Sequence, residues 1–199
     1  MEEQIMNMPA VALRGLTILP GMIAHFDISR ERSLRAVEEA MEQDQKIYLV
    51  TQRNVDSEDP TQEDLYQMGI VADIKQVVRL QNDVVRILVD GISRAALLGF
   101  TGNEKYLEAE ICYCDSNADS LPEDLREAML LGVREAFHRY AAVVGKISKE
   151  LIRQIDQYED LEKLIDYVTN NLPVSYELKQ QVLEAEDIND RYQVIVSLL

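Results

Sequence analysis

IVADIKQVVRL-QND-VVRILVDGISRAALL, residues 70–98, is the stretch that decides the fold of the first half of this chain. Ile70–Leu80 and Val84–Leu98 are rich in β-branched and aliphatic residues, which favour strands. Between them lies Gln81–Asp83, a polar segment of turn-forming residues. Two strand-like runs joined by a short polar turn predict an antiparallel hairpin.

Shorter strand-like segments lie on either side of this hairpin in the sequence. Lys46–Thr51 is a β-branched and aromatic run, Lys105–Cys114 is a further strand candidate, and Arg14–Ile28 alternates between turn and apolar residues. One predicted helix interrupts the strands over Arg30–Gln43, with Ser29 as its N-cap. The apolar stripe expected on that helix consists of Leu34, Val37 and Met41.

The composition changes to small and polar residues around Asp115–Ser120, where we expect a domain boundary. The predicted organisation is a strand-rich domain over residues 1–117 and a helical bundle over residues 118–199, which is an α+β fold. Ser120 and Glu123 have the spacing of a capping box and predict the start of the first helix of the bundle. The apolar positions expected on that helix are Leu125, Met129, Gly132, Ala136, Tyr140 and Val143.

The rest of the second half is also predicted to be helical. The expected helices cover Lys149–Gln157, Asp160–Asn171, Ser175–Ala185 and Ile188–Leu199, with a break at Pro173 and a cap at Asp187. The last helix is apolar to its end and shows none of the usual C-capping residues. This favours a chain cut from a longer protein, although a docked terminal helix would look similar.

The charge of the chain restricts its partners. The formal net charge is −16, from 36 acidic and 20 basic residues. Nucleic-acid binding relies on Lys and Arg to neutralise phosphates, and anionic lipid surfaces repel an acidic chain. There is no apolar run of about 18 residues that could span a bilayer, and no secretion signal at the amino terminus. We expect a cytoplasmic protein that binds neither nucleic acids nor membranes.

The search for catalytic and metal-binding motifs is negative. A phosphate-binding loop with Gly145 as its second glycine fails, because Tyr140 replaces its first glycine and Ile147 its Ser or Thr. His25 and His138 lack metal-ligand spacing. Structural zinc takes four ligands, so Cys112 and Cys114, the two cysteines of the chain, are expected to be thiols in a reducing cytosol. We expect no catalysis, cofactor or metal in this chain.

The remaining candidates for function are apolar residues on otherwise polar faces. Side chains alternate between the two faces of a strand. Along residues 23–28 this rule places Ile23 and His25 on the outer face, and along residues 84–90 it places Leu88 there. Scattered exposed apolar residues are common, whereas a contiguous patch marks a protein-binding site. The predicted binding residues, including the neighbouring apolar turn, are Pro20, Met22, Ile23, His25 and Leu88.

Several motifs together resemble the amino-terminal region of bacterial Lon-type ATP-dependent proteases. Leu13–Met22 resembles their opening motif, in which an apolar run follows Leu-Arg and ends in Pro-x-Met. Gly69–Ala72 matches a Gly-x-x-Ala strand start, and Leu88–Ala95 is close to Val-Glu-Gly-x-x-Arg-Ala, with Asp90 in place of Glu. Gln81–Asp83 departs from the Pro-Asp/Asn-Gly turn that is frequent in the family.

The helical half carries the same resemblance. Leu172–Pro173 and Leu178–Glu184 resemble Leu-Pro and Lys-Gln-x-x-Leu-Glu segments of the family, and Asp187–Arg191 is similar to its Asp-Val-x-x-Arg-Leu motif. The resemblance covers residues 9–199. It implies a β-barrel of the pseudouridine-synthase-and-archaeosine-transglycosylase (PUA) type, followed by a helical bundle.

The resemblance also implies a function. Lon proteins continue into a coiled-coil helix, an ATPase module that uses ATP and Mg, and a Ser-Lys protease domain, and they form hexameric rings. None of those modules is within this chain, so we expect it to recognise unfolded or damaged proteins that other domains degrade. Two alternatives remain open: a structural region that organises the ring, and a stand-alone ligand-binding or adaptor protein on the same fold.

Overall fold

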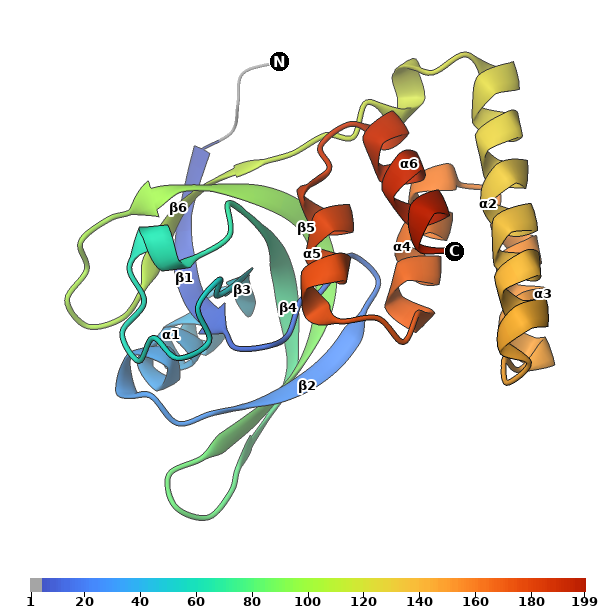
Figure 1. Cartoon of the computed structure of the whole chain (residues 1–199). Coiled ribbons are helices and arrows are strands. Elements are labelled where there is room, and N and C mark those ends of the chain that lie inside the picture. The colour runs from blue at the N-terminus through green and yellow to red at the C-terminus, as the bar shows by residue number, and fades with distance from the viewer. Residues whose placement is uncertain (1–4) are drawn as a thin grey trace. The chain divides into compact units, whose positions relative to one another are not determined.

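The computed structural model describes residues 5–199, which divide into two compact units. The first unit spans Met1–Cys114 and contains the strands, and the second spans Asp115–Leu199 and contains most of the helices (Figure 1). The dividing point lies at the start of the Asp115–Ser120 segment, where the composition changes. The fold class is α+β, as predicted.

The first unit is built on one sheet of six strands. These are β1 (Ile5–Leu13), β2 (Ile23–Ile28), β3 (Lys46–Thr51), β4 (Met68–Arg79), β5 (Val85–Phe100) and β6 (Glu108–Tyr113). Their order is β2-β5-β4-β3-β1-β6, and β6 also pairs with β5. The second pairing closes five strands into a ring and leaves β2 at an edge. All pairs are antiparallel except β1–β3, a parallel pair that the sequence did not predict.

The predicted hairpin is present as β4 and β5, and β3 begins and ends where the sequence places it. The structure also contains a strand that was not predicted, β1. Its last six residues, Met8–Leu13, are all buried. A strand covered on both faces is apolar at every position, so it lacks the alternation by which sequence analysis recognises strands.

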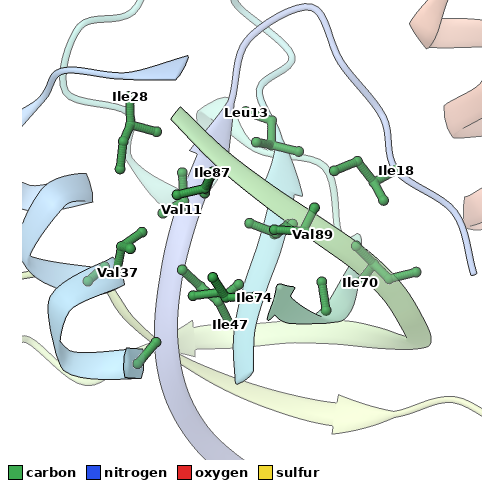
Figure 2. Packing of buried hydrophobic residues seen from close by; sticks show 14 of the residues in the cluster. Val11, Leu13, Ile18, Ile28, Val37, Ile47, Ile70, Ile74, Ile87 and Val89 are labelled. Atoms are coloured by element: carbon green, nitrogen blue, oxygen red, sulfur yellow. The ribbon is translucent and has the colours of Figure 1, made fainter. Parts of the chain in front are cut away.

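Two hydrophobic clusters pack on opposite faces of the sheet. Ile47 and Leu49 of β3 belong to the first cluster, whereas Tyr48 and Val50 belong to the second. Figure 2 shows the first cluster, which includes Ile87 and Val89 of β5, Ile28 of β2 and Val37 of α1 (Glu31–Glu42). The first cluster therefore fixes which face of β2 and β5 points away from the core.

The details of helix α1 differ from the prediction. Its N-cap is Arg30 rather than Ser29, and no side chain caps it. Met41 is 40% exposed, because the buried stripe is rotated from the expected one. That stripe consists of Ser33, Ala36, Val37 and Ala40, whose small side chains let the helix lie close to the sheet.

The second unit contains five helices in its described residues: α2 (Glu123–Val144), α3 (Lys149–Gln157), α4 (Leu161–Asn171), α5 (Tyr176–Glu184) and α6 (Ile188–Leu198). The bounds of α3 are those predicted. The predicted cap of α6 is confirmed, because the Asn189 amide donates to the Asp187 carboxylate (2.7 Å). Arg191 of α6 is fully buried, where it donates to the carbonyls of Ala185 and Glu186 and pairs with Glu162.

Two predictions for α2 are wrong. Its N-cap is Pro122, because the chain forms a short 3-10 turn at Ala118–Ser120 in which the Ser120 hydroxyl donates to the Asn117 carbonyl (2.6 Å). The ends of the expected stripe are also exposed, with Leu125 at 44% and Val143 at 88%. Only the middle of α2 is buried, at Met129, Val133, Ala136, Phe137 and Ala141.

No helix in the described part of the chain combines the length and the apolar character that crossing a bilayer requires.

Candidate functional site

A tight turn places the candidate residues at the start of β2. The Met22 amide donates to the Leu19 carbonyl (3.1 Å), and Gly21 has a φ of 70°. A positive φ at the third position, after Pro20, is the signature of a type II turn. The turn lies against β5 at Gly91, where an added Cβ would stand 2.4 Å from the Leu19 carbonyl oxygen. The glycine at position 91 therefore lets the turn approach β5 closely, so that β2 begins alongside β5.

β2 pairs with β5 in a register that sets three rows of side chains across the strands. Ile23 lies opposite Asp90, His25 opposite Leu88, and Asp27 opposite Arg86. The Gly91 amide donates to the Met22 carbonyl (3.0 Å), so Met22 and Gly91 form a hydrogen-bonded pair. Hydrogen-bonded and non-hydrogen-bonded pairs alternate along an antiparallel ladder, so the three pairs above are of the close, non-hydrogen-bonded kind. Side chains opposite one another in such pairs are in contact range.

These rows of side chains continue onto β4. We call this side of β2, β5 and β4, which lies opposite the first hydrophobic cluster, the outer face. Gln76 of β4 lies beside Leu88, and Val78 lies beside Arg86. Ile23 is 68% exposed and Val78 is 39% exposed, while Leu88 is half-buried between its neighbours. The outer face consists of Ile23, His25, Asp27, Gln76, Val78, Arg86, Leu88 and Asp90.

The charged groups of the outer face are paired with one another. The Arg86 guanidinium donates to both carboxylate oxygens of Asp27 (2.7 and 2.8 Å), and this hydrogen bonding holds the pKa of Asp27 below its ordinary value. Lys75, on the bulge of β4, lies 3.6 Å from Asp90 and 3.2 Å from Asp73. The ion pairs flank the apolar residues and leave little net charge beside them.

The structure brings three of the five predicted residues together. Ile23, His25 and Leu88 share the outer face, while Pro20 is half-buried at the corner of the turn. Met22 is half-buried and packs against the first hydrophobic cluster. A role of these residues in binding stays a prediction.

Sequence analysis missed the contribution of β4 to the outer face. A register shift between Ile74 and Gln76 inserts Lys75 as an extra residue. Such a bulge inverts the alternation of the residues that follow it. Gln76 and Val78 therefore lie on the same face as Leu88.

The described residues give no sign of a metal centre. Among residues 5–199, no three His, Cys, Asp or Glu side chains are arranged to hold an ion. Both cysteines are thiols, and the buried Cys112 Sγ donates to the Tyr113 carbonyl (3.6 Å). The outer face offers apolar contact and paired charges rather than reactive groups.

Comparison with known families identifies the fold. Residues 7–199 match the family model of the substrate-binding domain of ATP-dependent protease La (Lon). The chain belongs to this family. The resemblance seen in the sequence motifs is thereby confirmed over nearly the whole chain.

Curated relatives are Lon proteases from bacteria. The chain is 35% identical to Lon protease of Lachnoclostridium phytofermentans over 199 residues, which is 100% of this chain and 25% of that protein. It is 35% identical to Lon protease of Clostridioides difficile, covering 97% of this chain and 25% of the relative. Lon protease 1 of Bacillus subtilis is 30% identical over 100% of the chain and 25% of its own length. The chain thus spans about a quarter of the curated relatives it matches.

Solved structures share the fold. The N-terminal domain of Mycobacterium avium complex Lon protease superposes with a TM-score of 0.78 at 18% identity, covering 96% of this chain and 97% of that one. A Lon N-terminal domain protein from Xanthomonas campestris gives a TM-score of 0.66 at 13% identity, covering 98% and 99% of the two chains. At such identities the likeness shows a common architecture.

Proposed function

We propose that this Lon substrate-binding domain holds unfolded or damaged polypeptides through its outer face and passes them to the ATPase and protease segments of a longer protein. The observation that carries the proposal is Ile23, which is 68% exposed on a face whose neighbouring charges are paired. A large apolar side chain exposed on a rigid sheet, on the same face as Leu88, is suited to apolar segments that folded proteins bury. Hydrolysis itself, with ATP and Mg, is assigned to the other segments.

The expected binding is weak for a single domain. An apolar contact of about 200–300 Å² contributes about 5–8 kcal/mol. Association costs at least about 4 kcal/mol in lost freedom of motion. Six such domains in a hexameric ring would raise the effective affinity through multivalency. Weak single contacts also suit a protein that must release its client onward.

The outer face can be tested by a charge substitution. Leu88→Asp places a carboxylate between His25 and Gln76, and we expect binding of a fluorescently labelled, permanently unfolded protein to fall at least about fivefold, because apolar contact is lost. Fluorescence anisotropy measures the change. The matched control is Leu98→Asp on the same strand, where Leu98 is 43% exposed. Equal binding by the two variants would remove Leu88 from the site.

A second candidate function, organisation of the ring, is favoured by exposed apolar residues on α2. Leu131 is 54% exposed and Val143 is 88% exposed. A contact surface between subunits would cover such residues. Under this alternative, Leu131→Asp disrupts hexamer assembly of the full-length protein, seen by sedimentation velocity, while Leu88→Asp leaves client binding intact. Under the main proposal, Leu88→Asp impairs client binding in assembled rings.

A further inference from the structure

The backbone of β2 has one unused edge. In the described part of the chain, β2 pairs with β5 alone and lies at the end of the strand order. An edge strand presents a row of unpaired N–H and C=O groups to its surroundings. Natural sheets usually protect such edges, whereas among the described residues the edge of β2 beside the outer face is left unpaired.

The pairing with β5 shows which residues of β2 form the open edge. The Gly91 amide donates to the Met22 carbonyl, so the ladder uses the backbone groups of Met22, Ala24, Phe26 and Ile28. The N–H and C=O of Ile23, His25 and Asp27 point to the other side. The residues whose side chains lie on the outer face are therefore also the residues whose backbone groups are available.

There is space beside this edge. A cavity of about 200 Å³ opens where β2 ends, and its lining includes Asp27, Ser29 and Arg30 together with Ala12 of β1 and Arg14, which follows β1. The exposure of Ile23 and His25 leaves the beginning of the edge open to solvent. An extended chain could therefore lie along the whole of β2.

We propose that an extended segment of an unfolded polypeptide adds to β2 as a further strand, pairing its backbone with Ile23, His25 and Asp27. This inference rests on the proposed function and names how its site holds a client. Backbone pairing makes few demands on sequence, whereas alternate side chains of the added strand would contact the outer face. Unfolded chains have free backbone groups along their whole length, whereas folded proteins pair most of theirs.

The occupant is a client polypeptide rather than a second copy of this chain. Each copy carries a formal net charge of −16, so two copies repel one another when their edges approach. At long range the net charge of the whole chain attracts client segments that carry Lys or Arg beside apolar residues, while the charges of the outer face are paired with one another. Segments of this composition are the partners expected to pair with β2.

Amide hydrogen exchange measured by NMR tests the pairing directly. The probe is a 12-residue peptide of alternating Val, Thr and Lys, which is extended and cationic. On addition of the peptide to the intact chain, we expect the amides of Ile23, His25 and Asp27 to become protected from exchange at least about tenfold. The amides of Ala24 and Phe26 already bond to β5 and should change little. Binding without protection of the first three amides would overturn the proposal.

A pair of substitutions separates the backbone from the side chain. His25→Ala removes the imidazole and keeps the N–H, whereas His25→Pro removes both without breaking a bond to β5. We expect His25→Pro to bind the peptide about three to ten times more weakly than His25→Ala, the change that one lost hydrogen bond gives. Should His25→Pro fail to fold, a peptide N-methylated at alternate residues removes the bonds that the client's amides donate to the β2 carbonyls, and we expect the wild type to bind it at least about threefold more weakly than the unmethylated peptide.

The outcomes distinguish this inference from the proposed function. Equal binding by folded His25→Pro and His25→Ala, together with weaker binding by Leu88→Asp, leaves the proposed function standing and overturns strand addition. Absence of binding to any unfolded probe overturns both. A dimer of the free chain in sedimentation velocity that His25→Pro dissolves would show that a second copy occupies the edge, and would also overturn the proposal.

Discussion

At the scale of single residues, Gly91 decides where β2 lies. Its missing side chain lets the Leu19 carbonyl approach β5, and its backbone bonds both Gly21 (2.8 Å) and Met22 (3.0 Å). Any side chain at this position would push the turn away from the strand. The position of Ile23 on the outer face thus depends on a residue that is not itself part of that face.

We expect Gly91→Ala to lower the free energy of unfolding by about 1–3 kcal/mol, the range for overpacked sites. The added Cβ would meet a backbone oxygen at 2.4 Å, which cannot rotate away as a side chain can. Urea denaturation followed by circular dichroism measures the loss. Gly99→Ala on the same strand is the control, because its Cβ would have no neighbour closer than 3.8 Å. Similar stability of the two variants would contradict this account of the turn.

At the scale of elements, the β4–β5 hairpin carries most of the outer face. Its turn holds Asn82 and Asp83 at positive φ, 59° and 57°, with the Leu80 amide bonded to the Val84 carbonyl (2.8 Å). A non-glycine residue in this region is strained, although Asn and Asp tolerate it better than other residues. The turn forms despite its departure from the common family pattern because these two residues accept the required backbone.

Replacing the second of these residues by glycine should relieve the strain. We expect Asp83→Gly to raise the free energy of unfolding by about 0.5 kcal/mol, and Asp83→Val, a β-branched residue at the same φ, to lower it by about 1 kcal/mol or more. Thermal unfolding of both variants measures the order. If Asp83→Val were the more stable variant, strain at this turn would not limit the hairpin.

At the scale of the whole molecule, the chain consists of units with separate cores. Both hydrophobic clusters of the sheet are drawn from residues within Met1–Cys114. The helical unit buries its own set, which includes Phe137, Ile165 and Ile195. Stability is therefore supplied mainly within each unit.

We expect residues 1–114, expressed alone, to fold cooperatively and to keep the outer face, because no part of their two clusters comes from the helical unit. Dispersed NMR spectra and a single denaturant transition would support this. Binding of a fluorescent dye specific for exposed apolar surface, together with poor dispersion, would show that the first unit needs the second. The same fragment should retain the client binding that Leu88→Asp reduces.

The sequence by itself determined the family, the α+β class and most of the elements. The alternation of side chains along a strand, the periodicity of a helix and capping residues such as Asp187 each depend on a few neighbouring positions. They can therefore be recognised in the sequence before the tertiary structure is known. It also determined that Ile23, His25 and Leu88 point away from the core, since alternation along a strand is a local property.

Only the tertiary structure decided what those residues meet. The pairing of His25 with Leu88 joins strands distant in sequence, the bulge at Lys75 turns Gln76 and Val78 to the same face, and the unpaired edge of β2 follows from the order of all six strands. β1 was missed because burial on both faces removes its pattern. Pairing and burial depend on contacts between distant segments, which local sequence patterns do not encode.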